Sequence, residues 1–594
     1  MDKQNIRNMV LAGVLTLLIF VGWDWSMKYF YPNAAKAPVP AAGAPAAAPQ
    51  AAVSGKPTRE GGLTTPAEQA LEQKDLASAL NPATRVPIAA PGLSGSINLL
   101  GGTVDDLTIN RHTASNEKNA GPQRIFSPAG TPAQQFAEFG WQSPSGQPDP
   151  ALPTPATQWT APAGAKLTPQ SPVTLNWANA AGQTFALTYA IDADYMLTVT
   201  QTASNAGAAP LAVRPFALIN RTSKTASIDT WNVQSGPFGA FDEKVDFSNN
   251  YKDVTEKQAI VNAGKPDWLG FTDIYWMSAL IPDATKPGSG FRALGGDLFT
   301  ATLAYPDQAI PPGQQLAHTT KLFAGAKEST VLDRYEATGI ANFGLAIDWG
   351  WFRWFEKPIF WLLKTLFSFT ENFGVAIILL TLIVRGLMFP VAQRQFTSMA
   401  AMKAIQPKMK AIQERYKGDK AKQQEEIMGL YKKEGVNPLA GCLPIFLQIP
   451  VFFALYKVLI LSVEMRHQPF ALWIKDLSAP DPAHLLNLFG MLPFEVPGFL
   501  GIGVLALLLG VSMYFQFKLN PAQMDPAQQQ VFAIMPWMMM FIMAPFAAGL
   551  LIYWITSNFL TIGQQAYLYS RHPQLKAQAD KSADDAKRAK TRDG

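Results

Sequence analysis

The sequence predicts a mixed fold: a polytopic α-helical membrane protein with six transmembrane helices that also carries a large all-β domain. Three observations support this fold class. Long apolar stretches alternate with polar loops in the C-terminal half, short runs with every second residue apolar fill much of the N-terminal half, and the basic segments all fall on one side of the apolar stretches. Charged residues are only 16% and apolar residues 48% of the 594, which suits a chain partly embedded in lipid.

The N-terminus carries an export signal. Lys3 and Arg7 precede an apolar run over residues 9–23 that is short for a spanning helix. Two interpretations compete, a cleaved signal peptide and an uncleaved anchor with a cytoplasmic N-terminus. We favour an anchor over residues 1–31, and in both cases the following segment is exported. Residues 32–84 are rich in Ala and Pro and predict a flexible linker.

Residues 85–328 predict a large β-sandwich. Residues 185–191 and 195–199 each alternate apolar and polar, with a turn at residues 192–194 between them, which predicts a hairpin. Further strands are expected at residues 96–100, 211–219, 268–281, 298–305 and 315–323. The only histidines in this region are His112 and His318, and its carboxylates show no paired motif. A structural or docking module is therefore favoured over an enzyme. A carbohydrate-binding role stays open by analogy with other large sandwiches.

Residues 329–368 connect this domain to the C-terminal half. A short helix is expected at residues 329–342, followed by an amphipathic helix over residues 347–367. Trp349, Trp351 and Trp354, mixed with charged residues, favour a helix that lies in the membrane interface.

The apolar stretch over residues 372–390 is the first span of a five-helix core, residues 369–570. It holds one charge, Arg385, with Thr381 four residues earlier on the same helical face. An arginine within a span is costly, about 2.5–3.5 kcal/mol on insertion scales, so it usually faces water, a partner or a functional cavity. The alternative is that Arg385 snorkels to the headgroups.

The loop over residues 392–440 predicts a helical hairpin in the cytoplasm. Lys and Arg outnumber Asp and Glu there, as the positive-inside rule requires of a cytoplasmic loop. Apolar residues recur at the 3-4-3-4 spacing of a coiled-coil seam, at Met402, Ile405, Met409, Ile412 and Tyr416. Such a hairpin is either a solvated face or a contact for ribosomal RNA or a translocation factor.

Four more spans follow, at residues 442–463, 498–517, 531–548 and 549–566. The first of them contains Gln448, which is expected to face the bundle interior, and Lys457, which can snorkel. Residues 571–594 form a basic tail that fits the cytoplasm. With the anchor, the count is six spans with both ends of the chain in the cytoplasm.

Several classes of catalyst are excluded. Cys442 is the only cysteine, so no internal disulfide and no cysteine-based metal site can form. The chain has no Gly-rich phosphate loop ending in Gly-Lys-Ser/Thr and no HExxH motif, which argues against a nucleotide-driven motor and a common zinc hydrolase. We expect no cofactor, no metal and no nucleotide.

Four stretches of residues 345–570 resemble the YidC-type membrane protein insertases, in the Gram-negative branch of the YidC/Oxa/Alb family. They are IVRGLMFPVAQRQFTSMAAMKAIQPKMKAIQERY, YKKEGVNPLAGCLPIFLQIPVFFALY, PFALWIKDLSAPDP and LLIYWITSNFLTIGQQ. The resemblance implies a five-helix insertase core around a hydrophilic groove and a periplasmic β-supersandwich. It implies a chaperone of the bacterial inner membrane that moves hydrophobic segments of newly made proteins from the cytoplasm into the membrane. The implied partners are nascent membrane proteins, the ribosome, the Sec translocon and the lipid bilayer.

The resemblance also assigns groove residues. The family arginine maps onto Arg385, and the polar groove positions map onto Thr381, Gln448, Ser557 and Asn558. The substrate-contacting aromatic pair falls at Tyr553 and Trp554, and since Tyr is often found at the second position, this chain lacks one hydroxyl there. Lys457 stands where similar proteins often have an uncharged residue.

Two other functions compete with insertion. A polar-substrate transporter or channel could use Arg385 as an anion site, but paired repeats or symmetrically broken helices are not seen in the sequence. The other alternative is a periplasmic carbohydrate-binding protein held by an unusual anchor.

Overall fold

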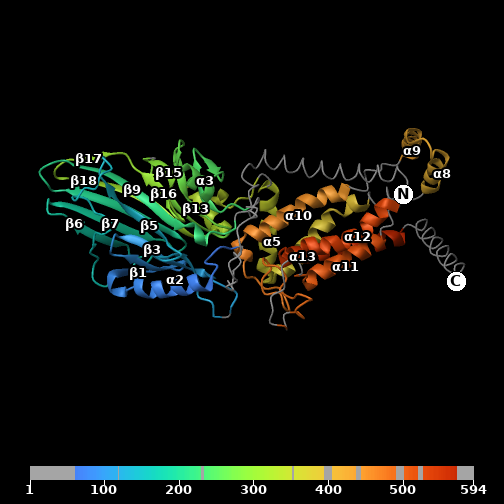
Figure 1. Cartoon of the computed structure of the whole chain (residues 1–594), viewed down its shortest axis with the longest axis horizontal. Helices are drawn as coiled ribbons and strands as arrows, with labels where there is room; N and C mark the ends of the chain where they lie inside the picture. Colours follow the sequence, from blue (N-terminus) through green and yellow to red (C-terminus); the bar gives the residue numbers. More distant parts are fainter. Residues whose placement is uncertain are drawn as a thin grey trace, which may run out of the picture. The chain divides into compact units, whose positions relative to one another are not determined.

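The computed structural model describes residues 60–117, 119–228, 233–285, 287–350, 353–393, 405–435, 443–489, 492, 501–519 and 526–571. The chain forms two compact units, Met1–Asp348 and Trp349–Gly594. Figure 1 shows strands in the first unit and helices in the second. The expected anchor, residues 1–31, and the basic tail, from residue 572 onward, lie outside the described residues.

The first unit is a sandwich of two antiparallel sheets. Strands of the 10-stranded sheet follow the order β1-β2-β3-β5-β9-β16-β15-β12, with β4 paired to β3 and β17 to β9. Their bounds are β1 (Arg85–Ala89), β2 (Leu93–Asn98), β3 (Thr103–Thr113), β4 (Pro122–Phe126), β5 (Gln135–Gln142), β9 (Leu211–Thr222), β12 (Ala259–Asn262), β15 (Gly288–Gly295), β16 (Leu298–Ala304) and β17 (Gln308–Ile310). The 8-stranded sheet follows the order β11-β10-β13-β14-β18-β8-β7-β6. Its bounds are β6 (Val173–Ala178), β7 (Gln183–Ile191), β8 (Met196–Asn205), β10 (Gly236–Phe241), β11 (Lys244–Asp246), β13 (Pro266–Thr272), β14 (Trp276–Ile281) and β18 (Gln314–Ala326).

The alternation of apolar and polar residues along the strands places the hydrophobic core between the two sheets. On β7 the side chains of Phe185, Leu187 and Tyr189 are buried, and the residues between them are exposed or half-buried. The hydroxyl of Tyr189 donates to the backbone carbonyl of Gly102 at 2.6 Å, which satisfies the one polar atom that this ring carries into the core. The hairpin of β7 and β8 forms with the expected turn between them.

One of the predicted strands is divided into two strands in the structure. Residues 268–281 were expected to form a single strand, but β13 and β14 are antiparallel neighbours joined by a turn. The backbone N–H of Asp273 donates to the carbonyl of Trp276 at 2.8 Å, and the Asp273 carboxylate accepts from the backbone N–H of Ser227 at 2.9 Å. These contacts stabilise a reversal that the continuous apolar pattern conceals.

Helices also differ from expectation at two points. Residues 66–79 of the expected linker form a helix, α2 (Pro66–Ala79), because the Thr65 side chain accepts from the N–H of Glu68 and Pro66 begins the first turn. The expected helix at residues 329–342 is shorter, α4 (Ser329–Ala337), followed by a 3-10 turn. A further short helix is α3 (Tyr251–Lys257).

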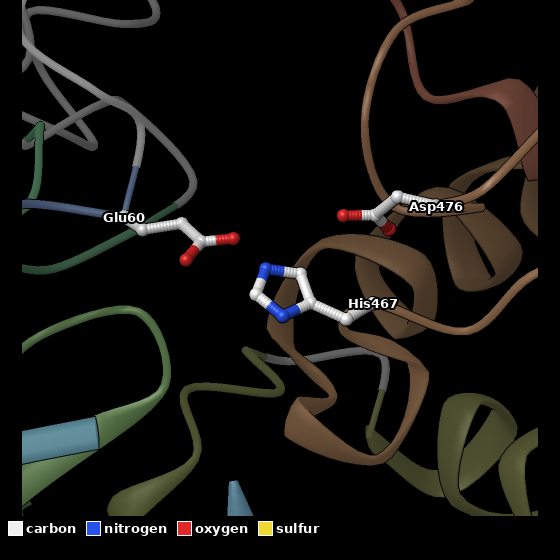
Figure 2. Close-up of side chains that lie close together, drawn as sticks. All are labelled: Glu60, His467 and Asp476. Atoms are coloured by element: carbon white, nitrogen blue, oxygen red, sulfur yellow. The ribbon is translucent and has the colours of Figure 1, made fainter. Parts of the chain in front are cut away.

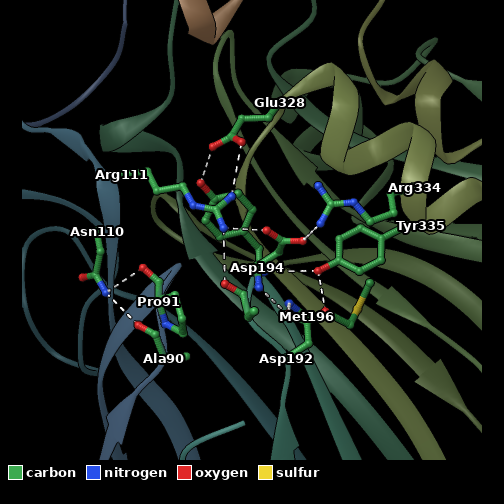
Figure 3. A network of polar contacts seen from close by, with 12 residues as sticks. Ala90, Pro91, Asn110, Arg111, Asp192, Asp194, Met196, Glu328, Arg334 and Tyr335 are labelled. Carbon is green, nitrogen blue, oxygen red and sulfur yellow. Dashed lines mark hydrogen bonds and ion pairs between the residues drawn. The ribbon is translucent and has the colours of Figure 1, made fainter.

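A polar network attaches α4 to the sandwich (Figure 3). The Asp194 carboxylate lies between two guanidinium groups, 2.6 Å from Arg111 and 2.5 Å from Arg334 of α4. The hydroxyl of Tyr335, one residue further along α4, donates to Asp192 at 2.6 Å. Two consecutive residues of α4 are thus bonded to the turn between β7 and β8.

A second polar group lies inside the sandwich. Arg221 and Asp273 form a buried ion pair at 2.6 Å. The ammonium group of Lys327, also buried, donates to the Thr272 hydroxyl at 3.1 Å. Burial lowers the pKa of Lys327 to about 8, although the nearby carboxylates of Asp273 and Asp348 act in the opposite direction.

The second unit is helical. Its described helices are α5 (Arg353–Thr370), α6 (Phe373–Leu387), α8 (Gln406–Arg415), α9 (Lys420–Glu434), α10 (Leu443–Leu461), α11 (Val504–Leu519), α12 (Pro526–Met543) and α13 (Ala548–Arg571). In the described part of the chain, no helix combines the length and the hydropathy required of a membrane span.

Helix α5 is amphipathic, as its tryptophans predicted. Ile359, Phe360 and Leu363 are buried, whereas Trp354 and Trp361 are 68% and 67% exposed. The ammonium group of Lys364 lies 3.5 Å from the Glu464 carboxylate just beyond α10, so α5 is paired with that end of α10.

Candidate functional site

Helix α13 carries most of the predicted groove residues, and they lie on two of its faces. Tyr553 and Ser557 are four residues apart and share one face, whereas Trp554 and Asn558 share the adjacent face. All but Trp554 are buried, and Trp554 is half-buried.

Arg385 contacts the first of these faces. Near the C-terminal end of α6, its Nε donates to the Ser557 hydroxyl at 3.0 Å, and its Nη2 approaches the same oxygen. The side chain is half-buried. Among the described residues, no carboxylate lies within ion-pair distance of Arg385. A neutral hydroxyl therefore orients the guanidinium group without compensating its charge.

Gln448 of α10 contacts the same face one turn away. Its side-chain amide donates to the hydroxyl of Tyr553, so α10 and α6 both bond to one stripe of α13. Trp554 instead packs against Phe452 of α10, with ring centroids 5.1 Å apart at 65°. The predicted aromatic pair thus divides into a hydrogen-bonded ring and a packed ring.

The remaining predicted residues face elsewhere. The Thr381 hydroxyl donates to the Ile377 carbonyl of its own helix at 2.6 Å and is fully buried. The Asn558 amide donates to the Ser512 hydroxyl of α11 at 2.9 Å. Sequence reasoning did not select Ser512 or Phe452, although the only serine in the apolar stretch of α11 was a usable signal for Ser512.

The predicted cytoplasmic hairpin is described in part. Met402 lies outside the described residues, Ile405 precedes α8 and is buried, and Met409, Ile412 and Tyr416 are half-buried. The Tyr431 hydroxyl of α9 approaches the Met409 sulfur of α8 at 3.1 Å.

An exposed ion pair also joins these helices, between Lys408 and Glu434 at 2.7 Å. Asp419 caps α9 by accepting from the N–H of Lys422 at 3.1 Å. Helices α8 and α9 therefore contact each other through Met409 of the predicted stripe and through this ion pair.

Lys457 of α10 is directed at the chain that precedes α5. A Cβ built on Gly350, which has a φ of 65°, would come within 2.8 Å of the Lys457 ammonium nitrogen. The side chain therefore approaches the backbone of its own unit at this point, where glycine leaves room for it.

His467 and Asp476 lie in the segment between α10 and α11 (Figure 2). The Asp476 carboxylate accepts from the backbone N–H and the hydroxyl of Ser478 at 2.8 and 2.7 Å, which fixes a local turn. Glu60, also drawn there, belongs to the first unit, whereas His467 and Asp476 belong to the second.

The two histidines of the sandwich are held by separate carboxylates. His112 lies 3.0 Å from Glu328, and His318 lies 3.3 Å from Asp283. Burial alone would raise the pKa of Glu328, but hydrogen bonds from His112 and Tyr195 hold it below its usual value. The geometry joins the two histidines in no common catalytic arrangement.

Comparison with known proteins identifies the chain's relatives. Residues 85–362 match the family model described as the YidC periplasmic domain, and residues 365–576 match that described as the 60Kd inner membrane protein. The chain is 39% identical over 592 residues to the membrane protein insertase YidC of Zymomonas mobilis, covering 98% of each chain. It is 41% identical over 618 residues to that of Paracoccus denitrificans, covering 96% of this chain and 95% of the relative.

A solved structure described as an active YidC insertase with its first transmembrane domain resolved is also similar. It has a TM-score of 0.36 and 19% identity, over 81% of this chain and 92% of that chain. The full-length similarity to the two bacterial insertases decides the assignment: this chain belongs to the YidC family of membrane protein insertases.

Proposed function

We propose that this insertase receives its clients in a hydrophilic groove formed where α6, α10 and α13 converge. The residues assigned to it are Arg385, Thr381, Gln448, Tyr553, Trp554, Ser557 and Asn558. The observation that carries the proposal is the hydrogen bond from Arg385 to the Ser557 hydroxyl, with no carboxylate within ion-pair distance among the described residues.

An uncompensated guanidinium group gives the groove its electrostatic character. Ionic attraction strengthens as the surroundings become less polar than water, so Arg385 lowers the free energy of a client's polar or acidic segment within the membrane. The Ser557 hydroxyl limits the directions in which the guanidinium can point, yet leaves donor groups free for a client or for water.

The apolar part of the client supplies the driving force. Moving a client helix into lipid is favourable by roughly 25 cal/mol per Å² of apolar surface removed from water. Tyr553 and Trp554 supply an aromatic wall along which such a helix slides outward, while its polar end is released on the far side. Insertion by this route requires no nucleotide.

The proposed topology places the machinery around this groove. The N-terminal anchor and helices α6, α10, α11, α12 and α13 cross the inner membrane, both termini are cytoplasmic, and the sandwich is periplasmic. The excess of Lys and Arg over residues 392–440 supports a cytoplasmic hairpin, which we assign to ribosome contact. The protein acts alone or beside the Sec translocon.

Site-specific photo-crosslinking tests the groove. Photoreactive residues replace Gln448 or Tyr553, and a stalled ribosome presents a nascent single-span protein. We expect both positions to crosslink to the client's apolar segment, and a matched probe at exposed Phe369 of α5 to give none. Crosslinks from Phe369 alone would place the client path elsewhere and refute the assignment.

A further inference from the structure

Strand β12 leaves part of its backbone unpaired at one edge of the 10-stranded sheet. It pairs only with β15, in register from Ala259 opposite Arg292 to Asn262 opposite Ser289. Just before β12, the carbonyl of Gln258 accepts from the N–H of Ala293.

Bonded and non-bonded positions alternate along an antiparallel pair, so this bond fixes the pattern. Ile260 and Asn262 direct their backbone groups at β15, whereas Ala259 and Val261 direct theirs away from the sheet. Among the described residues, the outward N–H and C=O groups of Ala259 and Val261 have no backbone partner.

Two of the other sheet edges are closed by a neighbouring segment. Along β1, Leu167 accepts from the N–H of Ala89 and donates to the carbonyl of Pro87, both at 2.9 Å. Along β6, Thr160 and Asn176 exchange both of their backbone bonds, at 3.0 and 2.9 Å. Each of these edges therefore lacks room for another strand where it is bridged.

The remaining end strand of the two main strand orders, β11, is protected by its composition. Strand β11 is only three residues long, and two of them, Lys244 and Asp246, are charged. Short length and charge are the usual protections of an edge strand. Strand β12 is four residues long, but it has no charged residue and no proline, and Val261 is 82% exposed.

The side chains beside this edge are uneven in size. Val261 stands opposite Gly290, which has no side chain, whereas the exposed Ala259 stands opposite the exposed Arg292. An added strand would pair through its backbone with the outward groups of β12, and such pairing depends little on the sequence of the added chain.

We propose that β12 is a docking strand for an extended, unfolded segment of a client protein, which pairs with the outward groups of Ala259 and Val261. The occupant follows from the function of the chain. The inference therefore rests on the proposed function, in which an insertase with a periplasmic domain meets unfolded segments of many client sequences. Backbone pairing is the one mode of recognition that all of these segments share. This site lies in the first unit and is separate from the proposed groove.

Crosslinking of the reconstituted full chain tests the docking strand. A photoreactive residue replaces exposed Ala263, next to the edge, and the client is a single-span protein with a translocated tail. One tail is rich in Thr and Val, and the second has proline at every other position, which removes the donors that strand pairing needs. We expect the first tail to crosslink at least about fivefold more than the second.

Variants of Val261 form the second part of the crosslinking experiment. Val261→Pro removes an outward N–H and no bond within the sheet, so the fold is retained, and hydrogen exchange of the β15 amides checks this. Val261→Lys places a charge on the edge without changing the backbone. We expect each to lower crosslinking of the Thr/Val tail by about fivefold, whereas Leu71→Lys, on exposed α2, leaves it unchanged.

Three results would overturn the proposal: equal crosslinking of the two tails, full crosslinking in both Val261 variants, or crosslinks from Ala263 only to a second copy of this chain. Insertion of a tail-less client measures the groove independently. If one of these three results is obtained while the tail-less client is still inserted, only the proposed docking role of β12 is refuted and the groove is not.

Discussion

The Nε of Arg385 lies 3.0 Å from the Ser557 hydroxyl, and this contact joins α6 to α13 without neutralising the arginine. Replacing Arg385 with Ala removes the charge that lowers the free energy of acidic client segments in the groove. We expect insertion of clients with acidic translocated segments to fall about tenfold, the factor that about 1.4 kcal/mol produces, and insertion of neutral clients to change much less. Insertion yields in reconstituted vesicles, measured over a client series graded in charge, check this.

Ser557→Ala and Arg385→Lys serve as controls. The first frees the guanidinium group while keeping its charge, and the second keeps a cation that lacks the planar fork. Both should retain most of the preference for acidic clients. An equal loss for acidic and neutral clients in Arg385→Ala would count against the electrostatic role.

Deletion of residues 60–320 separates insertion from the competing functions. An insertase whose groove lies in the second unit should keep most of its activity on tail-less clients, because no groove residue is removed. A sugar-binding protein would lose its function altogether. Insertion in vesicles and sugar binding by calorimetry distinguish these, and complete loss of insertion by a well-folded deletion protein would contradict our assignment.

Deletion of residues 400–435 tests the hairpin. We expect weaker insertion, because α8 and α9 supply the basic surface assigned to ribosome contact. The loss should be larger when clients arrive on ribosomes than when they are added as released chains. The charge-matched control exchanges the exposed pair, Lys408→Glu with Glu434→Lys. Unchanged insertion after the deletion would leave the hairpin without this role.

Lys327 makes the stability of the sandwich depend on pH. Its ammonium group loses its proton near pH 8 in the folded protein and near 10.5 in the unfolded chain. Between these values the unfolded chain binds more protons, so the free energy of unfolding rises with pH. We expect Lys327→Met to raise this free energy at pH 7 by up to roughly 3 kcal/mol and to remove the rise above pH 8. Hydrogen exchange of β18 measures both, and an unchanged pH profile in the variant would exclude this origin.

Glu138 of β5 makes the free energy of unfolding of the sandwich fall as pH rises, which is opposite to the effect of Lys327. Burial raises its pKa to about 7, from 4.5, and its carboxylate has no hydrogen-bond partner among the described residues. The folded protein therefore holds a proton that the unfolded chain has released, and stability falls as pH rises from 4.5 to 7. We expect Glu138→Gln to stabilise the sandwich at pH 8 by roughly 1–3 kcal/mol and to make no difference at pH 4. Glu117→Gln, at an exposed position, should leave the denaturation curve unchanged at both pH values.

The sequence was sufficient where one physical pattern dominated. The insertase function and the absence of enzymatic chemistry were predicted and are confirmed by the family assignment. The large β-sandwich was predicted from alternation, and β7 and β8 follow it residue by residue. The domain bounds, the groove residues and the six spans remain predictions.

Other features depend on contacts that a linear pattern does not contain. The reversal between β13 and β14 rests on Asp273, whose bonding partner Ser227 is distant in sequence. Helix α2 lies in a stretch whose composition predicts a linker. The N-cap residue Thr65 indicated a helix start there, but the richness in Ala and Pro favoured the linker. The sequence did not explain the charge of Lys457, because its side chain approaches Gly350, which lies far away in the sequence and precedes α5.

Tyr553 and Ser557 occupy one stripe of α13, and two other helices bond to that stripe. A turn of α13 about its own axis would break both bonds together, releasing Gln448 and Arg385 in a single concerted event. In the proposed groove, such a turn would make both side chains available to a client at the same time.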